Sequence, residues 1–71
     1  MGKLSAISGE KLMRILCNRF GFAALRQKGS HVTLNRGSIC VTIPLKEIRA
    51  GLLNRILKDC GIDKGEFEKI M

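Results

Sequence analysis

The fold is decided by residues 31–43, which read HVTLNRGSICVTI. Apolar and polar side chains alternate on both sides of a central Arg-Gly, the pattern of two antiparallel strands joined by a hairpin turn. A turn at Arg36-Gly37 predicts that Val32 lies opposite Val41 and that the apolar side chains share one face of the sheet. The single histidine, His31, then projects from the opposite face, toward solvent.

A third strand is predicted upstream, over Phe22–Gln27, because a turn signal follows it at Lys28-Gly29-Ser30. Side chains on a strand point alternately to its two faces. With Leu25 pointing toward the core, Arg26 points to the same face as His31.

Apolar residues at helical spacing lie on both sides of the predicted strands. One stripe lies between Ser8, a good N-cap, and Gly21, a terminating glycine, which predicts a helix over about 9–20. A second stripe ends at Gly61 and predicts another helix, after a polar link at 46–49. No Ser, Thr, Asp or Asn caps the start of this second helix. The two stripes consist of Leu12, Met13, Ile15, Leu16, Cys17 and Phe20, and of Leu52, Leu53, Ile56, Leu57 and Cys60.

The C-terminal segment predicts one more short helix. Asp63 and Glu66 form a capping pair, and Phe67 and Ile70 follow at helical spacing. The element order is therefore α-β-β-β-α with a short terminal helix. Two amphipathic helices can cover one face of a three-stranded antiparallel sheet and leave the other wet. We predict an α+β fold in a single domain over 1–71, since a chain of this length holds one core at most.

The charge balance points to a polyanionic partner. The chain has 13 Lys and Arg against 6 Asp and Glu, a net charge of +7. Such a surplus on a small surface favours nucleic acid first and a membrane surface second. Residues 1–36 carry a net charge of +6 and residues 37–71 only +1, so we expect the site in the first half. The cations of that half are Lys3, Lys11, Arg14, Arg19, Arg26, Lys28 and Arg36.

Several classes of protein are disfavoured. The longest uncharged run, Gly37–Leu45, is too short to span a bilayer, and no signal peptide is visible. The three cysteines, Cys17, Cys40 and Cys60, form no Cys-x-x-Cys pair, and one histidine cannot complete a zinc-finger pattern. We therefore expect reduced thiols in a cytoplasmic protein, with no metal site, no nucleotide or other cofactor, and no membrane partner.

His31 is the strongest candidate for chemistry. It follows a glycine turn, is predicted to face solvent, and has Arg26, Lys28 and Arg36 nearby in sequence. Nearby cations disfavour the charged imidazolium, so we expect a neutral imidazole. A neutral imidazole beside phosphate-binding cations can take the proton of a 2′-hydroxyl in base-catalysed RNA cleavage. From the residues alone, an ordinary surface histidine on a solvated basic face remains the alternative.

Five segments, in order along nearly the whole chain, resemble a known family. They are Ser8-Gly9-Glu10-Lys11-Leu12, Gly21-Phe22, Arg26-Gln27-Lys28-Gly29-Ser30-His31, Val41-Thr42-Ile43-Pro44, and Gly51-Leu52-Leu53 through Ile56-Leu57 to Gly61-Ile62. They resemble the HicA (YcfA-like) toxin family, most specifically in the Arg-Gln-x-Gly-Ser-His segment, which contains the Gly-Ser-His motif. The resemblance implies a fold like that of double-stranded-RNA-binding domains, mRNA interferase activity, and neutralisation by a HicB antitoxin. It implies a catalytic role for His31, and we expect RNA contacts from Arg26, Lys28, Gly29, Ser30 and Arg36.

The chain departs from the family pattern at two places. Val32 stands where many relatives carry a second histidine, and Lys46 where many carry a histidine after the strand-ending proline. His31 is therefore the only imidazole, and the acid that protonates the leaving group stays open between Lys28 and water. Two other functions also remain open: a non-catalytic double-stranded-RNA-binding module of the same topology, and a small protein-interaction module.

Overall fold

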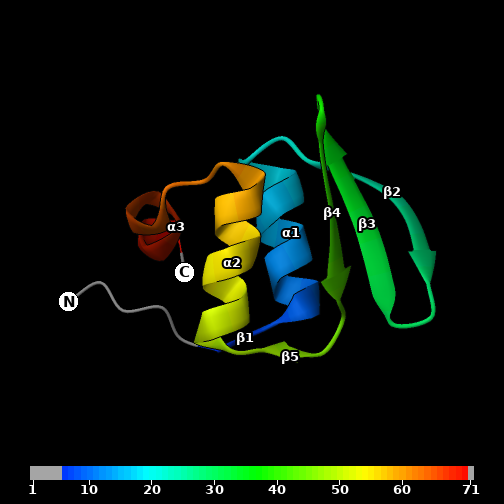
Figure 1. Ribbon diagram of the computed structural model, residues 1–71, viewed down its shortest axis with the longest axis horizontal. Helices are drawn as coiled ribbons and strands as arrows, with labels where there is room; N and C mark the ends of the chain where they lie inside the picture. The colour runs from blue at the N-terminus through cyan, green and yellow to red at the C-terminus, as the bar shows by residue number, and fades with distance from the viewer. Residues whose placement is uncertain (1–5, 71) are drawn as a thin grey trace.

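The computed structural model of the protein describes residues 6–70, and Figure 1 shows their arrangement. The predicted α+β order is confirmed, with two additional two-residue strands that the sequence did not reveal. In chain order the elements are β1 (Ile7–Ser8), α1 (Gly9–Arg19), β2 (Ala23–Lys28), β3 (His31–Arg36), β4 (Ile39–Pro44), β5 (Glu47–Ile48), α2 (Ala50–Cys60) and α3 (Lys64–Ile70).

The main sheet is antiparallel in the order β2-β3-β4, and its register differs by two residues from the predicted one. Val32 lies opposite Ile43, not Val41, because the two-residue turn is Gly37-Ser38 and not Arg36-Gly37. Gly37 has a φ of +61°, and a glycine at the first turn position followed by an ordinary residue is the pattern of a type II′ hairpin. A shift of two residues preserves the face of every side chain, so His31 remains on the wet face.

The hairpin between β2 and β3 has the same kind of turn, Gly29-Ser30, which places Lys28 directly opposite His31. The expected inward position of Leu25 is wrong. The pairing jumps between Ala24 and Arg26, so Leu25 is the extra residue of a β-bulge, and its side chain is 59% exposed. Bulges bend the strand that carries them, and β2 curves away from the helices in Figure 1. Arg26 still lies on the face of His31, because the pairing from the turn to Arg26 is regular.

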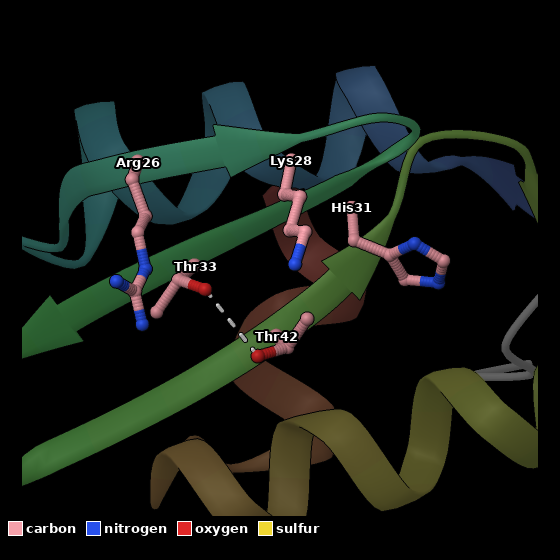
Figure 2. A pocket seen from close by; sticks show the side chains of 5 residues that line it. All are labelled: Arg26, Lys28, His31, Thr33 and Thr42. Carbon is pink, nitrogen blue, oxygen red and sulfur yellow. Dashed lines mark hydrogen bonds between the residues drawn. The ribbon is translucent and has the colours of Figure 1, made fainter.

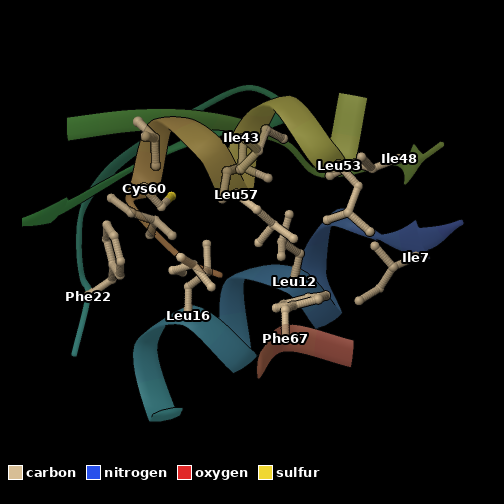
Figure 3. Close-up of a cluster of buried hydrophobic side chains, with 14 of the residues drawn as sticks. Ile7, Leu12, Leu16, Phe22, Ile43, Ile48, Leu53, Leu57, Cys60 and Phe67 are labelled. Atoms are coloured by element: carbon tan, nitrogen blue, oxygen red, sulfur yellow. The ribbon is translucent and has the colours of Figure 1, made fainter. Parts of the chain in front are cut away.

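The core lies between the sheet and α1 and α2, and Figure 3 shows its central side chains. The predicted helix stripes supply six of its fifteen buried residues, and Leu52, which is 45% exposed, does not join the core. Helix α1 begins as expected, because the Ser8 hydroxyl accepts from the Lys11 N–H at 3.1 Å. Helix α2 has no side-chain cap, as its sequence predicts. The fully buried large side chains are Leu12, Leu16, Leu34, Ile43, Ile48, Leu53, Leu57, Cys60 and Phe67.

The predicted polar link at 46–49 contains a buried residue. Ile48 pairs with Ile7 in the small β1-β5 sheet and is fully shielded from solvent. The Gly9 N–H also donates to the Lys46 carbonyl at 2.8 Å. These contacts fix the start of α1 against the segment that leaves β4.

None of the helices within residues 6–70 is long and apolar enough to cross a membrane. Lys3, one of the cations counted in the first half of the sequence, lies outside the described residues.

Candidate functional site

A pocket of about 380 Å³ lies on the sheet face that the helices leave open. Five residues line it: Arg26, Lys28, His31, Thr33 and Thr42. Figure 2 shows that their side chains all rise from β2, β3 and β4 on this one face. Two of the five are cations and none is a carboxylate, so the lining presents positive charge and hydrogen-bond donors to an incoming ligand.

The strand pairing explains why these side chains meet. Lys28 lies opposite His31, and Arg26 lies opposite Thr33, which in turn lies opposite Thr42. Directly opposed residues on antiparallel strands have Cβ atoms roughly 4.5–5.5 Å apart. The pocket is therefore built from two adjacent cross-strand rows, one with His31 and Lys28, the other with Arg26 and the two threonines.

The Gly29-Ser30 turn fixes the end of the pocket that carries His31. Gly29 has a φ of +61°, a conformation that side chains rarely adopt. The Gln27 side-chain amide donates to the Gly29 carbonyl at 3.1 Å. The Leu45 N–H donates to the Ser30 carbonyl at 2.6 Å. Gly29 and Ser30, two of the predicted RNA contacts, therefore lie beside the pocket and do not line it. They position Lys28 and His31, which do.

The side chains in the pocket have a definite order. In Figure 2, the Lys28 amine lies between the His31 ring and the two threonines. Arg26 lies beyond Thr33, on the side away from Lys28. Cations so placed can hold a phosphate by charge-assisted hydrogen bonds. An exposed imidazole at one end of that row can exchange a proton with a bound group. The arrangement is therefore suited to binding a phosphodiester with proton transfer at one side.

Arg36, the last of the predicted RNA contacts, is not brought into the pocket. Its Nη1 donates to the Phe20 carbonyl at 2.9 Å, and its guanidinium lies 5.0 Å from the ring centroid of Phe22. These contacts tie the end of β3 to the segment after α1. The prediction that Arg36 contacts RNA stays a prediction, and the contacts observed here are structural.

Sequence reasoning did not assign Thr33 and Thr42 to the site. Their hydroxyl oxygens lie 3.5 Å apart at the centre of the pocket. The alternation of the two strands did indicate that both threonines lie on the same face of the sheet as His31. The missing information was the register, which decides that the two threonines are directly opposed.

The cysteines lie outside this pocket. Cys60 is buried, and desolvation, with a smaller contribution from the Asp59 carboxylate, raises the pKa of its thiol from 9.0 to about 11. Cys40 is exposed and Cys17 is half-buried, and both are free thiols. Within residues 6–70, no three His, Cys, Asp or Glu side chains are grouped so that they could hold a metal ion.

Comparison with known proteins gives one result. The family model described as HicA toxin of bacterial toxin-antitoxin matches residues 9–62 of this chain, a range that includes every residue of the pocket. No curated protein and no solved structure matches the chain.

Proposed function

The chain belongs to the HicA toxin family of bacterial toxin–antitoxin systems, and on this premise we propose that it is an endoribonuclease that cleaves mRNA with His31 as its catalytic acid/base. The observation that carries the proposal is the pocket, in which the histidine of the Gly-Ser-His motif shares one open face with Arg26 and Lys28. Toxins of this family are generally RNases, which supports a nuclease activity for this chain.

The proposed reaction uses the 2′-hydroxyl of RNA as its nucleophile. His31 accepts the proton of that hydroxyl, the 2′-oxygen forms a bond to the adjacent phosphorus, and the bond from phosphorus to the 5′-oxygen breaks. Arg26 and Lys28 hold the phosphate, where their charge offsets the negative charge that develops on its oxygens. The products are a 2′,3′-cyclic phosphate and a 5′-hydroxyl end.

The departing 5′-oxygen needs a proton, and two sources remain. Lys28 is directly opposite His31, so its ammonium can supply the proton from the same row of the pocket. Solvent can also supply it, because the lining is exposed on its outer side. DNA lacks the 2′-hydroxyl, so this mechanism acts on RNA alone.

The proposal is tested by incubating the purified protein with single-stranded RNA in the presence of EDTA. We expect cleavage by the wild type and by Arg14→Ala, whose side chain is exposed on α1 and paired with Glu10. General acid–base catalysis contributes typically about 10²–10⁴-fold, so His31→Ala should lose at least about 100-fold in rate. Failure of the wild type to cut, or equal cutting by His31→Ala, would refute the assignment. Tight binding of duplex RNA without cleavage would instead support the double-stranded-RNA-binding alternative.

The toxin–antitoxin family implies an antitoxin partner, and we propose that this partner is a HicB-like protein. The cationic pocket favours a partner that presents acidic groups. Co-expression with the protein encoded by the neighbouring open reading frame checks this: we expect co-purification and loss of RNA cleavage in the complex.

A further inference from the structure

The two threonine hydroxyls at the centre of the pocket are close but poorly bonded to each other. Thr33 Oγ1 and Thr42 Oγ1 are 3.5 Å apart, whereas hydroxyl–oxygen bonds are usually about 2.7–2.8 Å long. Within residues 6–70 neither hydroxyl has another hydrogen-bond partner. Both protons are therefore available to a ligand at little cost.

The separation suits a single shared acceptor. An oxygen atom at about 2.8 Å from each hydroxyl closes a triangle on the 3.5 Å edge between Thr33 Oγ1 and Thr42 Oγ1. Both hydroxyls can then donate to that one oxygen. This is the geometry of a two-donor oxyanion site, in which the donors are fixed before the charge develops.

Three further features support a phosphate oxygen as that acceptor. The hydroxyls lie between the two cations of the pocket, with Arg26 on one side and Lys28 on the other (Figure 2). Among the described residues, no carboxylate lines the pocket to repel an anion. The threonines are directly opposed on the paired strands β3 and β4, and their β-branched side chains have few χ1 rotamers, so the pair is rigid.

We propose that Thr33 and Thr42 together donate hydrogen bonds to one non-bridging oxygen of the scissile phosphate. This inference rests on the proposed function and deepens it, because it assigns the centre of the pocket to the phosphorus atom and leaves His31 at one side for the 2′-hydroxyl. The pair holds the phosphate in the ground state. It binds more strongly when a further oxygen adds to phosphorus and negative charge accumulates on the non-bridging oxygens.

The test compares Thr33→Val, Thr42→Val and the double valine variant with Thr33→Ser and Thr42→Ser. Valine keeps the shape and the strand preference, whereas serine keeps the hydroxyl. Removal of one oxyanion donor typically costs about 10²–10³-fold in kcat at a buried site. For this exposed pair we expect a loss of about 10-fold or more in kcat for each valine variant. The double variant should lose less than the product of the two single effects, and serine should restore most of the rate.

A second arm identifies the oxygen and separates this inference from the proposed function. Sulfur substitution of one non-bridging oxygen at the cleaved phosphate should slow the wild type for one diastereomer, and that effect should disappear in the double valine variant. Binding of an uncleavable 2′-O-methyl RNA should weaken measurably in the double valine variant and recover in the serine variants. Cys40→Val, an apolar change on the same face outside the pocket lining, serves as the matched control and should change neither quantity.

Each outcome decides the matter. If the wild type cleaves RNA and the valine variants cleave equally well, the threonine assignment is wrong and the proposed function stands. If the wild type cleaves no RNA, the proposed function fails. The binding of 2′-O-methyl RNA then tests the threonine pair independently. Unchanged binding by the double valine variant then overturns it. Weakened binding with recovery by serine keeps the pair as a phosphate site without catalysis.

Discussion

Within residues 6–70, Cys60 is the only ionisable side chain that is fully shielded from solvent. Burial disfavours its thiolate, the Asp59 carboxylate disfavours it further, and the Arg36 guanidinium opposes these effects in part, so the pKa is about 11 against 9.0 for the exposed thiol. The thiol therefore serves the core as a small apolar group. The Cys60 thiol ionises only where the solution pH approaches these two pKa values.

This shift predicts a pH dependence of stability. Because the folded pKa is higher than the unfolded one, the stabilising contribution of the neutral thiol is complete below pH 9 and is lost as the pH rises toward 11. Relative to Cys60→Ala, the wild type should lose about 2 kcal/mol of unfolding free energy between pH 8.5 and pH 10.5. Urea denaturation of both proteins at several pH values measures the difference. Parallel pH profiles would show that the thiol does not titrate differently in the folded state.

The two hairpins of the main sheet have the same turn residues, but only one of the turns positions pocket residues. Gly29-Ser30 joins β2 to β3 and Gly37-Ser38 joins β3 to β4, and both glycines have a φ of +61° with open space around them. Only the first turn lies next to the pocket, between Lys28 and His31. The second lies at the opposite end of β3, so the two turns form a natural pair for separating stability from activity.

Substituting alanine for either glycine should destabilise the protein to a similar extent. A side chain in the left-handed region costs roughly 1–2 kcal/mol, and urea denaturation should show this loss for both variants. Gly29→Ala should also shift Lys28 and His31 as the turn relaxes, and misplacement by about 1 Å can cost up to about 100-fold in rate. RNA cleavage should therefore fall about 10-fold or more in Gly29→Ala and stay unchanged in Gly37→Ala. Equal cleavage by both variants would contradict a positioning role for the first turn.

The same elements show how far the sequence determines the structure. Alternation has a period of two, so it assigned His31 to the wet face correctly but could not separate registers that differ by two residues. The turn residues decide the register, and the pairing of Arg36 with Ile39 places the turn at Gly37-Ser38, one residue later than predicted. The bulge at Leu25 leaves no mark in the alternation. It places an apolar residue in solvent, against the burial preference on which sequence reasoning depends.

The candidate site was predictable to a similar degree. Closeness in sequence to the Gly-Ser-His motif grouped Arg26 and Lys28 with His31 in advance, and the pocket contains all three. The parity argument for Arg26 reached the correct face from an inward Leu25, which the bulge contradicts. Thr33 and Thr42 needed the register, which the sequence left ambiguous. Arg36 is even-numbered on β3, as Val32 and Leu34 are, and therefore points away from the pocket face.

At the scale of the whole molecule, the surplus charge of the first half does not form one patch. The cations of α1 lie on the helical side of the sheet, and one of them, Arg14, is paired with Glu10 at 3.1 Å. Among the cations of residues 6–70, only Arg26 and Lys28 line the pocket. Under the proposed function, we expect the net charge of +7 to attract RNA over the whole surface, and the two cations on the open face to determine where the RNA backbone is held.

The salt dependence of RNA binding separates these two contributions. For single strands, log K falls with log salt with a slope of about −0.7 per neutralised phosphate, so losing one direct contact should make the slope shallower by about 0.7. We expect this change for Arg26→Gln and for Lys28→Gln in a His31→Ala background, measured by fluorescence anisotropy with a labelled single-stranded RNA. The matched control is Lys69→Gln.

Lys69 lies in α3, at the other end of the long axis from β2 (Figure 1), and the molecule is 35 Å long. Screening at 0.1 M salt acts over about 10 Å, so a charge at that end contributes little to a phosphate held in the pocket. In the same background, Lys69→Gln should therefore keep the slope of the His31→Ala protein. If all three variants keep the slope of the parent protein, the RNA backbone is held elsewhere. Equally reduced slopes would mean that the whole basic surface, and not the pocket, supplies the contacts.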